Sequence, residues 1–151
     1  MFREMRRSQQ QLSAEDTKAV MERCTNGVLA CLGDDEYPYA VPLSYVYHKG
    51  KIYFHSAKSG HKIDAITKHP KVSFAVIDED TIVGEKFTSY FRSVIAFGKA
   101  RVAEREEWLE AMRALVEKYS AAAPEALKAK EISGGTQAHV MVIDVEHITG
   151  K

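Results

Sequence analysis

The stretch "YFHSAKSGHK", residues 53–62, concentrates groups that bind anions. Ser56, His61 and Lys62 lie where the strand pattern "KIYFH" gives way to a helical pattern. A helix start offers free backbone N–H groups and the positive end of the helix dipole. Together with the Lys62 ammonium, these groups could hold a phosphate. The other interpretation is a capped helix start whose charges face water, and these residues alone do not choose between the two.

His55 stands at the end of the same strand pattern. Alternation places it on the face opposite Phe54, so its ring looks either into a pocket or into solvent. In a pocket, imidazole can donate or accept a proton near neutral pH. The 6 histidines show no H-x-H or H-E-x-x-H spacing, so no metal site is predicted. The chain also has no G-x-S-x-G motif, and a hydrolase is not predicted.

Two further polar features interrupt strand patterns. Arg92 and Ser93 lie in "YFRSVIAFG", where a buried charge is costly unless it is paired. Arg92 must therefore reach solvent, a carboxylate or an anionic ligand, and a plain salt bridge is the default. Pro42 lies inside "YAVPLSYVY" and cannot donate a ladder hydrogen bond. It belongs at a sheet edge, at a bulge or beside a ligand.

Hydrophobic periodicity and turn residues predict the elements that position these side chains. Helices are predicted at residues 13–24, 60–69 and 105–119, with a short helical piece after Pro124. Strands are predicted at residues 27–32, 39–47, 51–55, 71–78, 88–104 and 138–148. A loop is expected at residues 78–86, a tight hairpin at Gly50 and a bend or bulge at Gly98. The pattern predicts one mainly β (α+β) domain over residues 1–151, a six-stranded antiparallel barrel with peripheral helices.

Composition limits the possible partners. The chain has 21 basic and 21 acidic side chains, so no overall field would gather nucleic acid or an anionic membrane. No run approaches the roughly 18 apolar residues of a membrane span, and a soluble cytoplasmic protein is expected. Cys24 and Cys31 lack C-x-x-C spacing and are expected to be buried thiols. The absence of G-x-G-x-x-G counts against a doubly wound nucleotide-binding fold.

The order of the motifs adds a family resemblance. The chain carries "MRR", "YAVPLSYVY", "IYFHSAKSGHKIDAI", "KVSFAV", "YFRSVIAFGKARVAE" and a closing "HITGK" in succession. This order resembles the pyridoxamine 5′-phosphate oxidase-related flavoproteins, especially their nitroimidazole-resistance (Nim) branch. The resemblance covers nearly the whole chain, and "FHSA…GHK" together with "RSVIAFG" is more specific than either piece alone. Residues 78–88 match the family pattern poorly, which leaves the substrate side of the site undefined.

The resemblance implies a split β-barrel homodimer that binds FMN in two equivalent sites at the subunit interface. Ser56, His61 and Lys62 match the FMN phosphate contacts of the family. The segment formed by Val41, Pro42, Leu43 and Ser44 matches the strand along the isoalloxazine ring. Arg92 and Ser93 match a segment near the flavin, which the same chain or the other subunit supplies. His55 matches the histidine that Nim proteins place beside the flavin.

The resemblance also implies an FMN-dependent oxidoreductase. In this interpretation a reduced nicotinamide, NAD(P)H, supplies electrons, and a small acceptor such as a nitroaromatic receives them. His55 is the candidate catalytic residue, which would orient or protonate the acceptor. The chain lacks a recognisable pyridoxal phosphate-binding C-terminal segment, so vitamin B6 oxidation is not expected. The alternative is a flavin- or haem-binding module that stores or senses its ligand without turnover.

Overall fold

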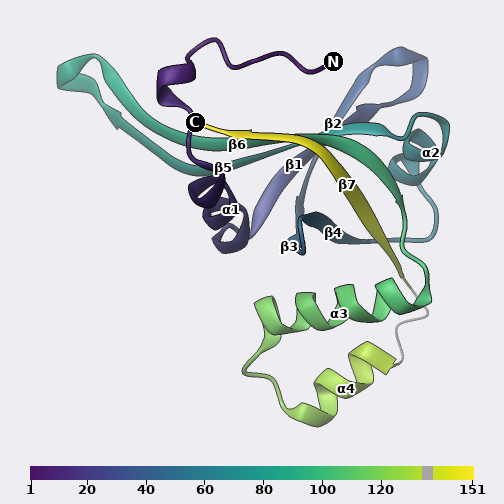
Figure 1. Cartoon of the computed structure of the whole chain (residues 1–151). Helices are drawn as coiled ribbons and strands as arrows, with labels where there is room; N and C mark the ends of the chain where they lie inside the picture. Colours follow the sequence, from purple (N-terminus) through teal and green to yellow (C-terminus); the bar gives the residue numbers. More distant parts are fainter. Residues whose placement is uncertain (134–137) are drawn as a thin grey trace.

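The structure, a computed structural model, describes residues 1–133 and 138–151. Its centre is one seven-stranded antiparallel sheet (Figure 1). In chain order the strands are β1 (Asn26–Leu32), β2 (Pro38–Ser44), β3 (Val46–His48), β4 (Lys51–Ser56), β5 (Lys71–Val83), β6 (Thr88–Val102) and β7 (His139–Gly150). The helices are α1 (Ala14–Arg23), α2 (His61–Lys68), α3 (Arg105–Ser120) and α4 (Glu125–Ser133). Short 3-10 turns lie at Ser8–Gln10, Asp34–Glu36 and Gly84–Lys86.

The sheet has seven strands, and the prediction of six was wrong in this respect. The segment expected as one strand at residues 39–47 is divided at Tyr45, whose ring is fully buried. Residues up to Ser44 pair with β1, whereas residues from Val46 pair with β4. The Tyr45 hydroxyl donates a hydrogen bond of 2.7 Å to the Met21 carbonyl oxygen. The break therefore occurs where the chain anchors a side chain in the core.

The sheet curls into a barrel. The strand order is β2-β1-β5-β6-β7-β4-β3, and β2 also lies against β4. Register shifts occur between Ile77 and Glu79 in β5 and between Phe97 and Gly98 in β6, so the predicted irregularity at Gly98 is confirmed. A Cβ atom at Gly98 would lie 2.2 Å from the Asp144 carbonyl oxygen, which no other residue type would tolerate without movement. These irregularities bend long strands around a closed core.

Apolar side chains fill the inside of the barrel. Leu29, Phe54, Phe74 and Ile143 come from four different strands, and each is fully buried. Helix α1 packs against β3, β6 and β7, and it begins as predicted at Ser13, whose Oγ accepts the Asp16 N–H at 3.0 Å. Burying this much apolar surface is the main source of the fold's stability.

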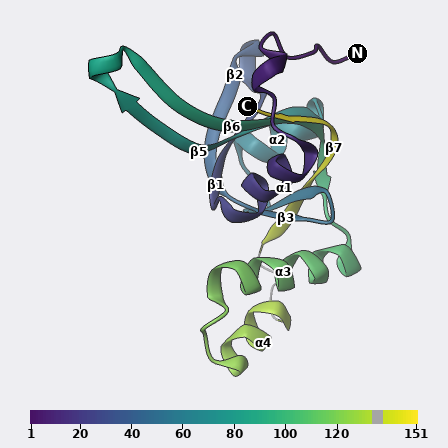
Figure 2. The same cartoon turned by 60° about the vertical axis from the view of Figure 1, so that its left-hand side comes forward.

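A second apolar cluster lies outside the barrel, between the sheet and α3. Val46, Tyr53 and Val142 of the sheet pack against Met112 and Leu115 of α3. Helix α4 then packs along α3 but buries none of its own residues. Figures 1 and 2 show both helices gathered at one end of the molecule, beyond β4 and the start of β7. This cluster places the inner face of α3 against the outer face of β4.

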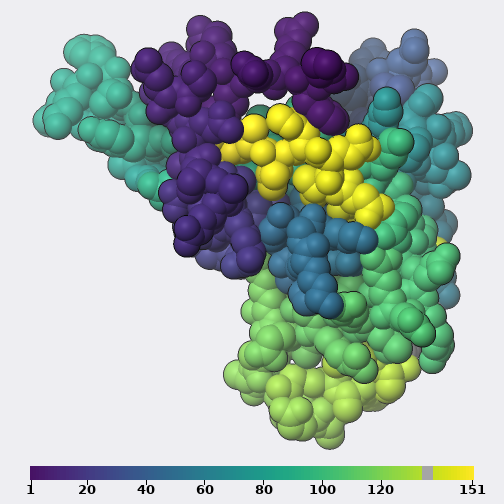
Figure 3. Space-filling model, in the orientation of Figure 1, coloured from purple at the N-terminus to yellow at the C-terminus, as the bar shows by residue number. Residues whose placement is uncertain are grey.

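The loop predicted at residues 78–86 was wrong. Strands β5 and β6 stay paired as far as Val83 and Thr88, and Phe87 takes a left-handed conformation (φ 49°) beside the turn. The paired ends form an arm that stands clear of the barrel (Figures 1 to 3). The acidic "DEDTIVGEK" composition suggested a loop, but acidic side chains suit a strand whose faces meet water. We call residues 78–92 the arm.

The remaining sequence expectations concern the thiols, the tight turn and the membrane. Cys31 is buried and Cys24 is half-buried at the end of α1, and both thiols are free. Gly50 has φ 76° in the turn between β3 and β4, so the predicted hairpin is confirmed. Within the described residues, no helix has the length and apolar character to cross a membrane.

Candidate functional site

The junction of β4 and α2 places the polar residues that the sequence singled out. Strand β4 pairs antiparallel with β7, with His55 opposite Val140, so His55 lies on the outer face and Phe54 lies in the barrel. Ser56 follows and is buried, and its Oγ donates a hydrogen bond of 3.1 Å to the Ala57 carbonyl oxygen. Gly60 precedes α2 with φ 135°, a conformation that glycine adopts readily. Helix α2 therefore begins after only a short connection from the end of β4.

Two hollows flank His55. The first, which we call the basic hollow, has a volume of about 690 Å³ and is lined by residues that include His55, Ser56, Lys62 and Lys130. The second, the apolar hollow, has a volume of about 450 Å³ and is lined mainly by α3 and α4 residues that include Leu115, Val116 and Tyr119. Four residues line both hollows: His55, Met112, Leu127 and Glu131. The two hollows therefore adjoin, and His55 lies at their boundary.

His55 faces a pocket, which was one of the two orientations left open by the sequence. Its Nε2 atom lies 3.1 Å from the Met112 Sδ atom. A thioether sulfur is only a weak hydrogen-bond acceptor, so this contact holds the imidazole weakly. The ring can therefore form a stronger hydrogen bond with a bound ligand. The side chain is also exposed to the hollows. His55 can therefore present a ring nitrogen to a molecule bound on either side.

Lys62 lines the basic hollow together with Ser56. Among residues 1–133 and 138–151, no carboxylate lies within ion-pair distance of the Lys62 ammonium. The ammonium group is therefore available to pair with an anionic ligand. Lys130, on α4, adds a second cation to the same hollow. The two lysines outnumber the one carboxylate of the lining, Glu131, so the net charge of this hollow favours an anion.

His61 points elsewhere. Its Nε2 atom accepts the Asp34 backbone N–H at 3.4 Å, and its ring stacks on Tyr39 at a centroid distance of 4.2 Å. The ring also fills the space beside Gly33, where a Cβ atom would lie 2.9 Å from Nε2. His61 thus holds the turn before β2 and does not line either hollow.

The "AVPL" segment forms the outer strand of the sheet. Val41 and Leu43 pack against the core, whereas Pro42 and Ser44 lie on the exposed face. Pro42 lies on an edge strand, where it is paired with Val28 of β1. A sheet edge was one of the three positions expected for a proline without a backbone N–H. Ser44 lines the apolar hollow together with His55. Ser44, at the end of β2, and His55, near the end of β4, therefore lie on the wall of the same hollow.

Arg92 and Ser93 lie apart from the hollows, at the base of the arm. The Arg92 Nη1 atom lies 3.1 Å from the Asp78 Oδ2 atom and 3.6 Å from a Glu79 carboxylate oxygen, so the default of a salt bridge is what the structure contains. Ser93 exchanges backbone hydrogen bonds of 2.9 and 3.0 Å with Lys151. Within one chain these two residues do not meet Lys62 or His55.

Asp78 organises the base of the arm. Arg23 approaches it through two nitrogens at 2.9 and 2.6 Å, and Arg92 adds a third contact. The Cys24 Sγ atom lies 3.3 Å from the same carboxylate. The Arg23 hydrogen bonds, followed by those from Arg92 and Cys24, hold the pKa of Asp78 far below its usual range. Local sequence patterns do not indicate this cluster, because Arg23 and Asp78 are 55 residues apart in the chain.

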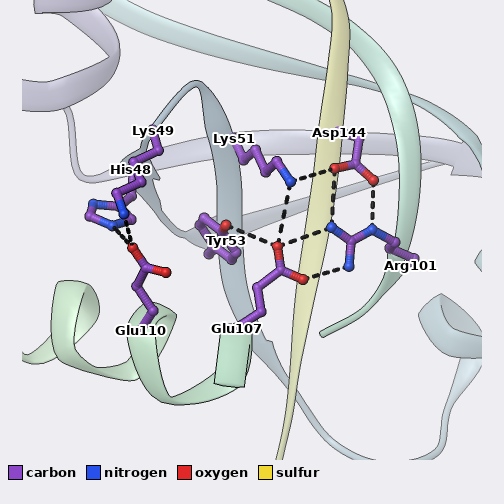
Figure 4. Close-up of polar contacts among 8 residues, drawn as sticks. All are labelled: His48, Lys49, Lys51, Tyr53, Arg101, Glu107, Glu110 and Asp144. Atoms are coloured by element: carbon purple, nitrogen blue, oxygen red, sulfur yellow. Dashed lines mark hydrogen bonds and ion pairs between the residues drawn. The ribbon is translucent and has the colours of Figure 1, made fainter. Parts of the chain in front are cut away.

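A polar network joins α3 to the sheet (Figure 4). Arg101 contacts Asp144 at 2.6 Å and Glu107 at 2.5 Å, and Lys51 lies between the two carboxylates. The Tyr53 hydroxyl donates to Glu107 at 3.2 Å, and burial raises the pKa of Tyr53 to about 12. The guanidinium of Arg101 lowers the pKa of Glu107. This network sets the position of α3 along the sheet.

The donor set fits a flat apolar molecule that carries an anionic group. Lys62, the Ser56 hydroxyl and the α2 backbone N–H groups can hold the anion. The side chains of Met112 and Leu127 can lie against an apolar ring, since thioether and aliphatic groups pack well on aromatic faces. Sequence reasoning missed Met112, Leu127 and Lys130. Met112 belongs to the apolar cluster between α3 and the sheet, and only the fold shows that it also faces the hollows.

The family model described as pyridoxamine 5′-phosphate oxidase matches residues 13–151. The chain belongs to this family. The resemblance inferred from the motifs is thereby confirmed at the level of the family. Among curated proteins, an uncharacterized protein of Rhizobium meliloti strain 1021, RA0666, is 28% identical over 149 residues, which cover 93% of this chain and 92% of that protein.

Solved structures share the fold. A candidate 5-nitroimidazole antibiotic resistance protein of Bacteroides thetaiotaomicron is 18% identical, with a TM-score of 0.78 over 93% of this chain and 84% of that chain. An FAD-binding protein of Mesorhizobium loti is 26% identical, with a TM-score of 0.68 over 93% and 95%. A heme-binding protein of Mycobacterium smegmatis is 20% identical, with a TM-score of 0.70 over 91% and 53%. The split-barrel prediction, with peripheral helices, is confirmed.

Proposed function

We propose that the protein is an FMN-dependent oxidoreductase that reduces a small acceptor, such as a nitroaromatic compound, with NAD(P)H as the donor. The observation that carries the proposal is the pairing of the two hollows. Lys62 and Ser56 lie at the cationic end, the α3 side chains lie at the apolar end, and His55 lies between them. Membership of the family and the likeness to flavin-binding and nitroimidazole-resistance proteins support it.

Each residue has a physical role in this proposal. Lys62 and the backbone N–H groups of α2 hold the FMN phosphate, with the Ser56 hydroxyl beside them. The edge strand that ends at Ser44 supports the ring system, because an edge strand offers unpaired backbone groups. The bound cofactor supplies the redox chemistry, and the chain supplies position and electrostatics. His55 orients the acceptor and moves a proton at Nε2.

We also propose a homodimer in which the partner completes the site. The arm exposes Ile82, Phe87, Tyr90 and Phe91, whose exposed fractions are 76%, 98%, 54% and 45%. The strand register places Ile82 and Phe91 on one face of the arm and Tyr90 on the other. Exposed apolar side chains gathered on one projecting element favour a protein contact. Arg92 lies at the base of the same arm. In a two-fold dimer the arm would bring Arg92 and Ser93 toward the partner's flavin, where the family pattern expects them.

The experiment that tests the function is turnover by the FMN-loaded protein with NAD(P)H and a nitroaromatic acceptor. The variant His55→Ala should keep bound flavin and lower kcat by about 10²- to 10⁴-fold, the usual range for a general acid–base group. His69→Ala is the matched control, because His69 is an exposed histidine at the end of α2. Unchanged turnover in His55→Ala would remove His55 from the mechanism. Absence of turnover with every donor and acceptor in the wild type would contradict the enzymatic role itself.

A second candidate function is a flavin- or haem-binding module that stores or senses its ligand. The observation that favours it is the position of His55 at the boundary of the two hollows, since histidine is a common axial ligand of haem iron. The likeness to a heme-binding protein supports the same candidate. Absorption spectra after incubation with each cofactor distinguish the two. A Soret band that is lost in His55→Ala would favour haem, and oxidised-flavin bands would favour FMN.

A further inference from the structure

The apolar hollow differs from the basic hollow in its cations, because Lys62 and Lys130 line only the basic hollow. Its walls combine apolar side chains of α3 and α4, such as Leu115 and Val116, with the hydroxyl groups of Ser44 and Tyr119. Its volume of about 450 Å³ lies within the range of small-molecule sites, roughly 300–1,000 Å³. Its only cation among the described residues is Lys128, which is already engaged with Glu125 at 2.8 Å and with the Ala121 carbonyl oxygen at 2.9 Å. Among the described residues that line this hollow, the one lysine is therefore already paired.

Glu131 lies at the boundary of both hollows. Within residues 1–133 and 138–151, no cation lies within ion-pair distance of its carboxylate. Leu127 lies one helical turn earlier on α4 and lines both hollows, although 59% of its surface is exposed. An exposed leucine and an unpaired glutamate on one face of a helix thus form the outer wall of the apolar hollow.

From this arrangement we propose that the apolar hollow is the acceptor compartment and that it selects neutral aromatic acceptors over anionic ones. Leu127 supplies the steric wall, and Glu131 repels negative charge. The inference rests on the proposed function, since it takes the basic hollow as the place of the cofactor phosphate. A bound phosphate offsets the charges of Lys62 and Lys130, which leaves Glu131 as the uncompensated charge beside the acceptor.

The expected discrimination follows from Coulomb's law. Two unit charges at 4 Å interact by about 1 kcal/mol in bulk water and more strongly near a protein surface. An anionic acceptor should therefore bind about five- to tenfold more weakly than a neutral molecule of the same size. Without flavin, Lys62 and Lys130 have no phosphate to neutralise them, and the discrimination should decrease or reverse.

The test is the binding of 4-nitrobenzamide and 4-nitrobenzoate to the oxidised FMN-loaded protein, measured by calorimetry without an electron donor. The wild type should bind the amide about five- to tenfold more tightly. Glu131→Gln should bring the two dissociation constants together. Leu127→Trp should weaken both by about tenfold by filling the hollow. Ala126→Trp, which adds the same ring to an exposed α4 residue that lines neither hollow, should change neither.

The outcomes separate this inference from the proposed function. Flavin absorption of each variant shows whether the cofactor is bound, independently of the acceptor. If the chain takes up no flavin, the proposed function fails, and the inference fails with it as an account of acceptor selection. If flavin binds normally but Leu127→Trp and Ala126→Trp behave alike, the acceptor lies elsewhere. If 4-nitrobenzoate binds as tightly as 4-nitrobenzamide in the flavin-loaded wild type, the role of Glu131 is refuted.

Discussion

Replacing Asp78 by asparagine should destabilise the protein through the base of the arm. Asp78→Asn preserves the shape of the side chain but removes the negative charge that Arg23 and Arg92 share. It also leaves the Cys24 thiol beside a neutral amide. The Asp78 carboxylate is only 11% exposed, so water cannot fully replace the lost contacts. Both guanidinium groups would then repel each other without a counter-ion between them.

The size of the effect can be worked from these contacts. Hydrogen bonds to charged groups contribute roughly 1.5–3 kcal/mol each. The two arginine side chains are 49% and 43% exposed, so water compensates much of that loss. We therefore expect the free energy of unfolding to fall by about 2 kcal/mol. For a chain of this size, that corresponds to a decrease of Tm of about 4–8 °C.

Urea denaturation as a function of pH provides the assay. Because the folded-state pKa of Asp78 lies below its unfolded value, the stabilisation is complete above the unfolded pKa of about 3.9 and is lost as the pH falls. The difference between wild type and Asp78→Asn should be constant near neutrality and shrink below about pH 4. Asp80→Asn, an exposed residue of the same strand, is the control. A difference below about 0.5 kcal/mol at pH 7 would refute the structural role of the cluster.

Two other predictions concern assembly and the placement of α3. Light scattering should give about twice the chain mass of 16.9 kDa. Phe87→Asp should shift the protein to a monomer. Tyr37→Asp should not, because Tyr37 is 74% exposed but lies outside the arm. A wild-type monomer that binds FMN tightly would contradict the shared site. Glu107→Gln weakens the contacts of Arg101 and Tyr53 and should lower the free energy of unfolding by about 1 kcal/mol with an unchanged urea m-value, whereas Glu106→Gln should have little effect. Equal stability of the two variants would show that this network does not hold α3.

Local signals in the sequence were enough to predict several elements. The cap at Ser13, the turn at Gly50 and the irregularity at Gly98 each depend on a few adjacent residues. The alternation in β4 also predicted which side of the strand carries His55. These features follow from backbone sterics and from the period of a strand, which act over short stretches of chain.

Features that depend on distant partners were missed. The acidic composition of the arm suggested a loop. Composition alone does not indicate that β5 pairs with β6 along this segment. The cluster at Asp78 joins α1 to two strands, and Met112 reaches the hollows only because α3 packs on β4. The orientation of the His61 ring depends on Tyr39 of β2, and two further strands separate β2 from α2 in the chain. Such contacts are fixed by tertiary packing and leave no local periodicity.

The binding of FMN and riboflavin to wild type and Lys62→Ala tests the central proposal most directly. Titration of the flavin-free proteins by fluorescence quenching gives four dissociation constants, and their ratio of ratios isolates the phosphate contribution. Lys62→Ala should weaken FMN binding about 10- to 100-fold and leave riboflavin binding nearly unchanged. Lys68→Ala, at the other end of α2, should affect neither flavin. Equal weakening of both flavins by Lys62→Ala, or of neither, would contradict a phosphate site at Lys62.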